Sequence, residues 1–388
     1  MKKFLFVANR YDDSPAGGTS NCHSHYEILR RIPELGSGQI ISTINRTQEA
    51  ESEPGKIVIK CARTYFDALV NTFTGKAASF DAMYSLKAEN EIVSMVKNGE
   101  YNFIWFDDCT YGSTIRKIKA VRPDLPVYVF YHVIVGKCLL RTMRQNIFRL
   151  KGLINIQKHI NYMNLQRLSA EYADVNVILN GRDMATFTGL YGSHVKLMLP
   201  VSFIDSANIM PVKKNPDEFN IFFIGINTKQ NIDGIKWFAL NVMPKLDSRA
   251  RLIIAGNVMN GIKDEPEFKD NPVINVAGRV ENLDSYYNMA DLVIVPIFYG
   301  EGMMTKAAEA MMYGKNILAT SHALNGYHEI EESCRCDTPE EYISRINAMI
   351  ENGTERFNPE MRKIFEEQYS INAMVNTIRE SLKQHGIL

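Results

Sequence analysis

The chain has 388 residues, of which 45% are hydrophobic and 23% are charged. These values are ordinary for a globular protein and exclude disordered and fibrous classes, and the length suits two domains of ~150–200 residues each. Because 44 Lys and Arg balance 44 Asp and Glu, no net charge attracts nucleic acid. The halves differ, however: residues 1–200 hold 25 basic and 18 acidic residues, and residues 201–388 hold 19 and 26. The first half is therefore better suited to anionic surfaces.

The first apolar run, Phe4–Ala8, is followed at once by polar residues, so it predicts a buried strand rather than an export signal. No stretch reaches the ~18 apolar residues that a membrane span needs. The six cysteines are scattered without metal-ligand spacing, which favours a reducing compartment. We expect a cytoplasmic protein, either soluble or peripheral on the inner face of the membrane.

Short apolar runs alternate with longer helical stretches along the whole chain. In chain order these runs cover residues 4–8, 39–44, 57–59, 103–106, 127–131, 175–179, 195–199, 221–224, 252–255, 273–276, 292–297 and 317–319. Most are continuously apolar, which is typical of strands covered by helices on both faces. Strand–helix–strand repetition implies right-handed crossovers and parallel sheets. Both halves are therefore predicted to be doubly wound α/β domains.

Polar and proline-containing residues at 200–217 interrupt this pattern and predict a domain boundary. We expect an N-terminal Rossmann-like domain at residues 1–203 and a C-terminal domain at residues 204–388, with the option that the last helix packs back on the N-terminal domain. The tail is predicted to be helical, with Pro339 and Pro359 at helix starts. Ligands of such sheets bind beyond the carboxyl ends of the strands, and two facing domains would form one cleft.

The segment 290–314 carries the clearest pattern for a binding site. A buried strand ends at Pro296, a loop with Gly300 and Gly302 follows, and a run of helix formers begins near Met304. The N–H groups at a helix start carry the positive end of the helix dipole and bind phosphates. A glycine in front of them lets ligand oxygens approach the backbone closely. We therefore expect a diphosphate at Gly302, Met303, Met304, Thr305 and Lys306.

Three charged residues extend this pattern. Lys306, in the first turn, opposes the helix dipole, which makes sense if an anion binds there. Glu309, one turn further, could accept hydrogen bonds from both hydroxyls of a ribose. Glu301 lies in the preceding loop, where a sugar would be placed. Spacing alone leaves an alternative open, in which both glutamates are solvated residues of a helix with acidic ends.

The pattern Glu301-x7-Glu309 resembles the donor motif of retaining glycosyltransferase family four. The resemblance runs from Phe223-Ile224-Gly225 through Val276–Val280 to Gly314. It implies a GT-B fold of two facing Rossmann-like domains, with the acceptor mainly on the first. It also implies retaining transfer of a hexose or N-acetylhexosamine from a UDP- or GDP-sugar to a glycan or lipid-linked glycan hydroxyl. Surface polysaccharide or glycoconjugate synthesis is the expected process, with no metal and no cofactor.

By the same resemblance, Glu309 holds the ribose, Gly302–Thr305 hold the diphosphate and sugar, and Glu301 contacts the sugar. Many members carry an Arg–Lys pair after the glycine that matches Gly225, whereas this chain has Ile226 and roughly Asn231 at those places. The cation that replaces the pair is left open among Lys229, Lys306 and Arg279, with Lys306 best placed. The expected donor-binding set is completed by Gly225 and Asn227.

Three features of the first half are candidates for chemistry. Gly17 and Gly18 follow the first strand and resemble a flexible Gly-Gly loop of the family that lies near the ligands; a plain strand–helix turn is the alternative. His132 ends the strand 127–131, and family members often have a histidine here that contacts the donor sugar. We expect His132 to assist catalysis together with Glu301. Asp107-Asp108 lacks a metal-binding context, so a structural or acceptor-facing role is expected.

Between residues 125 and 170 there is no acidic residue, while seven basic residues are interleaved with apolar ones at 137–167. Such a segment favours contact with anionic lipid headgroups, and a solvated helix face is the alternative. Nucleic acid is not expected, because no recognition motif accompanies the charge. Two rival functions stay open: a non-catalytic GT-B subunit that binds or chaperones a transferase, and a sugar-nucleotide epimerase of the same fold. A dehydrogenase is disfavoured because no G-x-G-x-x-G follows a strand.

Overall fold

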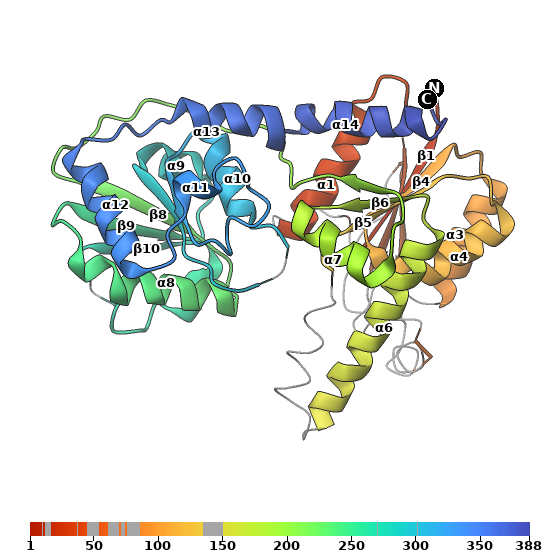
Figure 1. Ribbon diagram of the computed structural model, residues 1–388, viewed down its shortest axis with the longest axis horizontal. Helices are drawn as coiled ribbons and strands as arrows, with labels where there is room; N and C mark the ends of the chain where they lie inside the picture. The colour runs from red at the N-terminus through yellow and green to blue at the C-terminus, as the bar shows by residue number, and fades with distance from the viewer. Residues whose placement is uncertain are drawn as a thin grey trace. The chain divides into compact units, whose positions relative to one another are not determined.

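The computed structural model describes residues 1–9, 11, 17–36, 38–44, 54–60, 70, 74–75, 86–134, 150–269, 271–300 and 302–388. The chain divides into two compact units (Figure 1). The first unit comprises Met1–Pro200 together with Met374–Leu388, and the second comprises Val201–Ala373. Among the described helices, none combines the length and apolarity that a membrane crossing needs.

The first unit is built on a seven-stranded parallel sheet with the order β3-β2-β1-β4-β5-β6-β7. The chain winds outward in one direction from β1 and then in the other direction from β4, so the order reverses between these two strands. Its strands are β1 (Phe4–Asn9), β2 (Gln39–Ile44), β3 (Lys56–Lys60), β4 (Phe103–Phe106), β5 (Val127–Tyr131), β6 (Val175–Ile178) and β7 (Lys196–Met198).

Helices cover both faces of this sheet. They are α1 (Gly17–Arg30), α3 (Leu86–Asn98), a 3₁₀ turn (Cys109–Tyr111), α4 (Gly112–Val121), α6 (Leu150–Tyr172), α7 (Gly181–Tyr191) and α14 (Ile371–Gln384). Because strand side chains alternate between faces, Leu5, Val7 and Ile104 pack on one face against α3 and α4, with Ile92 and Ile115 in the same buried core.

The opposite face of the first sheet is aromatic. Phe4 stacks on Phe103 and Trp105 stacks on Tyr128, with ring centroids 5.5 and 5.8 Å apart. Tyr26 of α1 packs edge-on against Phe6. The C-terminal helix α14 also reaches this face, where the Tyr128 hydroxyl lies 3.1 Å from the Ser381 hydroxyl. Residues 374–388 therefore complete the core of the first unit.

The second unit contains a five-stranded parallel sheet with the order β10-β9-β8-β11-β12. Its strands are β8 (Phe219–Ile224), β9 (Ala250–Ala255), β10 (Ile274–Gly278), β11 (Leu292–Val295) and β12 (Ile317–Ala319). Its helices are α8 (Lys229–Asn241), α9 (Asp284–Met289), α10 (Thr305–Met312), α11 (Glu331–Cys334), α12 (Pro339–Glu351) and α13 (Pro359–Ile364), with 3₁₀ turns at Met243–Lys245 and Asn257–Gly261 and a π turn at Phe365–Tyr369. Here the strand order reverses between β8 and β11.

The amino edge of the second sheet is fastened by a buried carboxylate. Asp291, directly before β11, accepts from the Arg356 Nε at 3.0 Å and from the Asn220 backbone N–H at 2.8 Å. Lys214 lies 3.4 Å from the same carboxylate. These polar side chains therefore stabilise the edge opposite to the one where ligands of such sheets bind.

The sequence predictions of strands and fold class are confirmed. Every apolar run named above overlaps a strand, both sheets are parallel, and both units are doubly wound. Pro339 and Pro359 each occupy the first helical position, where the missing N–H costs no hydrogen bond.

Candidate functional site

The carboxyl edge of the second sheet is held together by three glycines, one at the end of each of three strands. The Gly225 N–H donates to the Ala255 carbonyl at 3.0 Å, and the Gly256 N–H donates to the Gly278 carbonyl at 2.6 Å. A Cβ on Gly256 would lie 2.3 Å from the Gly225 carbonyl oxygen, and its φ of 93° also requires glycine. The backbone at this edge is therefore closely packed.

The loop after β11 leads into α10 across the point where the strand order reverses. Gly302 has a φ of 75°, a conformation that L side chains rarely adopt. Helix α10 begins at Thr305, so the first N–H groups of the helix have no intrahelical acceptor. The fully buried Tyr327 donates its hydroxyl to the Met304 carbonyl at 2.7 Å and fixes this helix start. Sequence reasoning did not identify Tyr327, which lies after β12, outside the pattern of residues 290–314.

Lys306 and Glu309 lie half-buried one turn apart on α10. Loss of water around the Lys306 amine lowers its pKa, and the charge of Glu309 opposes this shift. Burial likewise raises the pKa of Glu309, and Lys306 opposes it. The Lys306 Nζ lies 6.0 Å from the centre of the Phe223 ring. Within the described residues neither side chain forms an ion pair.

A buried tyrosine pair lies beneath this site. The rings of Tyr287 and Tyr313 are stacked 4.2 Å apart and nearly parallel, at 7°. The Tyr313 hydroxyl donates to Asp284 at 2.6 Å. The pKa of Tyr287 is raised well above its ordinary value, mainly by burial and also by the charge of Glu309. Sequence reasoning did not predict this packing of Tyr287 near Glu309.

The remaining predicted donor residues are spread along the same edge. Lys229 is exposed and pairs with Asp233 at 2.5 Å, and this hydrogen bond raises the pKa of Lys229. Asn227 and Arg279 are exposed directly after β8 and β10. Asn231, at one of the places where many family members carry a cation, is buried and donates its amide to the Ile226 carbonyl at 2.9 Å. Its role here is to hold the loop.

Glu301 lies outside the described residues, so its predicted contact with the sugar stays a prediction. Met303 is buried, and Met304 and Thr305 are half-buried at the start of α10. The structure thus brings Gly302, Met303, Met304, Thr305, Lys306 and Glu309 together on one loop and helix.

In the first unit, Gly17 and Gly18 are the first residues of helix α1, and their expected place near the ligands stays a prediction. His132 follows β5 and contacts the buried Asp107, which was expected to be structural or acceptor-facing. Asp108 accepts from the Thr110 N–H at 2.6 Å and caps the 3₁₀ turn. Asp107 and Asp108 therefore have different roles.

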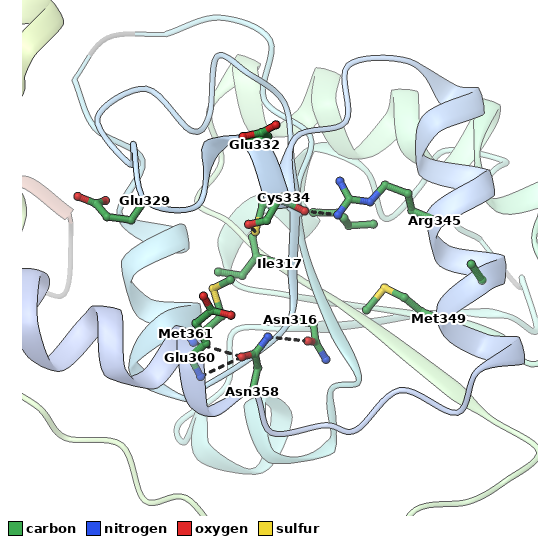
Figure 2. A pocket seen from close by; sticks show the side chains of 13 residues that line it. Asn316, Ile317, Glu329, Glu332, Cys334, Arg345, Met349, Asn358, Glu360 and Met361 are labelled. Atoms are coloured by element: carbon green, nitrogen blue, oxygen red, sulfur yellow. Dashed lines mark hydrogen bonds between the residues drawn. The ribbon is translucent and has the colours of Figure 1, made fainter.

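A pocket of about 610 Å³ lies beside the edge strand β12 (Figure 2). Glu329, Glu332, Arg345, Asn358 and Met361 are among its lining residues. In Figure 2 the Arg345 side chain reaches from α12 toward the turn at Cys334, and Asn358 contacts Asn316. None of the predicted donor-binding residues lines this pocket, so it is separate from the α10 site.

Comparison with known proteins bears on the second unit most directly. Residues 218–352 match the family model described as "Glycosyl transferases group 1". The matched range contains Lys306, Glu309 and the three glycines at the strand ends. No curated protein is similar enough in sequence to be matched to this chain. In the part of the chain that the structure describes, no three His, Cys, Asp or Glu residues are grouped to hold a metal ion.

Solved structures match both units. Sucrose-phosphate synthase from Thermosynechococcus elongatus has 13% identity and a TM-score of 0.70, covering 99% of each chain. Anabaena HepE in complex with UDP has 14% identity and a TM-score of 0.67, covering 99% of this chain and 100% of that one. The lipopolysaccharide outer core galactosyltransferase WaaB has 10% identity and a TM-score of 0.64, covering 98% and 100%.

The fold is GT-B. This confirms the fold that the sequence resemblance implied, and the group 1 match supports a glycosyltransferase. The narrower assignment to family four stays a prediction.

Proposed function

We propose that the chain is a retaining glycosyltransferase that takes a hexose or N-acetylhexosamine from a UDP- or GDP-sugar. The observation that carries the proposal is the start of α10, where open N–H groups, Lys306 and Glu309 follow Gly302 at the reversal of strand order. HepE, a neighbour of the same fold, has been crystallised with UDP and with UDP-glucose, and the group 1 match covers this segment.

In the proposed complex, the diphosphate lies at the N–H groups of residues 302–306, and Glu309 accepts from the ribose hydroxyls. Negative charge grows on the leaving phosphate in the transition state, and donors already fixed in place stabilise that charge most effectively. Tyr327 fixes those donors by holding the Met304 carbonyl. Lys306 supplies a positive charge in a partly desolvated place, where its electrostatic effect is larger than in water. The proposed reaction uses no metal and no cofactor.

For the acceptor we propose a hydroxyl of a glycan or lipid-linked glycan, in surface polysaccharide or glycoconjugate synthesis. The excess of basic residues in the first half supports an acceptor presented at an anionic membrane surface. Residues 135–149 of the basic segment lie outside the described residues. Arg167, at its end, pairs with Glu171 at 3.1 Å. The proposal places the protein in the cytoplasm, peripheral to the inner face of the membrane.

The variant Glu309→Ala tests the donor site. It should weaken UDP or GDP binding by about 1–3 kcal/mol, because a charged hydrogen bond to the ribose is lost. Calorimetry on the folded variant measures this loss. Glu351→Ala, at the exposed end of α12, is the matched control and should bind as the parent does. Equal affinity of the Glu309→Ala variant and the parent for both nucleotides would refute the donor site.

A panel of nucleotide sugars separates the proposal from its rivals. A transferase should hydrolyse one donor slowly and should be stabilised by it in thermal unfolding. A non-catalytic subunit would show stabilisation without turnover, and an epimerase would return an isomeric nucleotide sugar. Either of these last two results would replace the proposed function.

A further inference from the structure

A buried carboxylate and two histidines meet at the carboxyl edge of the first sheet. Side chains along a strand alternate between the two faces of a sheet, and Trp105 of β4 lies opposite Tyr128 of β5. Asp107 and His132 continue these two rows, so they lie on the same aromatic face. His25 of α1 packs on that face against the Phe130 ring, 4.1 Å between centroids. The His25 Nδ1 lies 2.6 Å from Asp107 Oδ1, which also accepts from Trp105 Nε1 at 3.1 Å.

The contacts of His25 show which of its ring nitrogens serves Asp107. His25 is fully buried, and its Nε2 has no hydrogen-bond partner among the described residues. A carboxylate oxygen accepts, so the His25 Nδ1–H donates to Asp107 Oδ1. His25 thus holds Asp107 in place as a hydrogen-bond donor.

His132 is the more accessible of the two histidines, because its side chain is 26% exposed whereas His25 is fully buried. Its Nε2 lies 2.9 Å from the Asp107 carbonyl oxygen and 3.4 Å from Asp107 Oδ2. A carbonyl oxygen can only accept, so Nε2 carries a hydrogen in both charge states. Nδ1 is therefore the atom that gains or loses a proton.

The electrostatics of the cluster agree with this assignment. Burial alone would lower the pKa of His132, but the hydrogen bond and charge of Asp107, with a contribution from Asp108, raise it above its ordinary value. Burial alone would raise the pKa of Asp107, but the two imidazoles outweigh it and hold that pKa well below its usual range. His25, Asp107 and Asp108 are the titratable groups that face His132 among the described residues.

We propose that Asp107 and His25 are positioning residues that turn His132 Nε2 inward, so that its Nδ1–H donates a hydrogen bond to an oxygen of the substrate. This inference rests on the proposed function only in taking the acceptor of that hydrogen bond to be a substrate. The arrangement of the three side chains can be tested without any activity. The substrate oxygen belongs to a sugar hydroxyl or a phosphate, both of which accept from an imidazolium.

Nitrogen-15 NMR of the histidine rings in the ligand-free full chain tests the positioning, with His132→Ala identifying the signals. The His132 Nε2 should stay protonated throughout the titration, and Nδ1 should titrate with a pKa above the ordinary 6.5. In Asp107→Asn that pKa should fall by about one unit or more, because the opposite charge is removed. His328→Gln, an exposed histidine of the second unit, should change nothing at His132.

Two outcomes would overturn the proposal: a mixture of tautomers at His132 in the parent chain, or an unchanged His132 pKa in a folded Asp107→Asn variant. If that variant does not fold, the tautomer and pKa of the parent chain still decide. His25→Gln keeps a donor to Asp107, whereas His25→Leu removes it. The single His132 tautomer should persist in the first and be lost in the second, and its persistence in both would remove His25 from the proposal.

Activity gives a second, independent test once a donor is known. The amide nitrogen of Asn can replace Nδ1, and that of Gln can replace Nε2. His132→Asn should therefore retain at least about tenfold more kcat/KM than His132→Gln, since one lost donor at a reacting centre costs 10²–10³-fold. The reverse order would refute the Nδ1 donor. Absence of turnover with every donor would refute the proposed function and leave the NMR result standing.

Discussion

Lys306 stands in the first turn of α10, where a cation is opposed by the helix dipole. Burial also disfavours its charge, and no described side chain forms an ion pair with it. Such a side chain destabilises the ligand-free protein, and a bound anion would offset that cost. Burial likewise disfavours the charged carboxylate of Glu309, and hydrogen-bond donors of a ligand would offset that cost. Both residues are therefore better explained by ligand binding than by stability.

The variant Lys306→Ala should weaken the binding of UDP or GDP more than the binding of the matching nucleoside, because only the diphosphate meets the amine. Since the pKa of Lys306 is lowered in the free protein, a bound diphosphate should raise it, and binding should take up protons between the two values. Calorimetry in buffers of different ionisation enthalpy measures both effects. Lys245→Ala, at an exposed position after α8, serves as the control. Equal losses for nucleotide and nucleoside would contradict the role of Lys306.

At the scale of elements, the packing of α8 against the end of β11 supports the loop that leads to the site. Gly234 lies inside α8, and a Cβ there would come within 2.1 Å of the Pro296 carbonyl oxygen. The helix can approach the strand end only because this position has no side chain. In α7, by contrast, a Cβ on Gly189 would meet no atom within 4 Å.

These two helical glycines give a matched pair of variants. Gly234→Ala should destabilise the protein by about 1–3 kcal/mol, because overpacking must displace α8 or the strand end. Gly189→Ala should be neutral or stabilising by up to about 1 kcal/mol, because alanine favours helix. Urea unfolding measures both. A Gly234→Ala variant as stable as the parent would show that the close approach does not constrain the helix.

Much of the element scale could be predicted from sequence, because continuously apolar runs such as 292–297 directly reflect burial on both faces of a sheet. The α10 site was predictable for a related reason: Gly302, Lys306 and Glu309 lie close in sequence, so local spacing encodes their geometry. The cluster of His25, Asp107 and His132 was not, since its members are 82 and 25 residues apart. The sequence does contain the alternation of residues 103, 105 and 107 and of residues 128, 130 and 132. That alternation predicts a cluster only when the pairing of β4 with β5 is known.

For the whole molecule, the unequal charge of the two halves sets an expectation for surface binding. The first half carries the basic excess and the second the acidic one, so an anionic surface should attract the first and repel the second. This would orient the protein on a membrane before any specific contact forms.

The full chain should sediment with vesicles that contain anionic lipid at low salt and be released as salt is raised, since screening shortens the range of the attraction. Vesicles of neutral lipid alone are the control and should not bind it. No sedimentation with anionic vesicles at low salt would end the membrane proposal.

The return of α14 to the first unit has a consequence for how the protein is made. A ribosome releases the amino-terminal sheet long before it reaches residues 374–388, so the part of the aromatic surface at Tyr128 lacks its cover from α14 in the nascent chain. Tyr128 meets Ser381 only at the end of translation. A premature stop codon upstream of Met374 should therefore harm the half of the protein that was synthesised first, although every residue of its sheet would be intact.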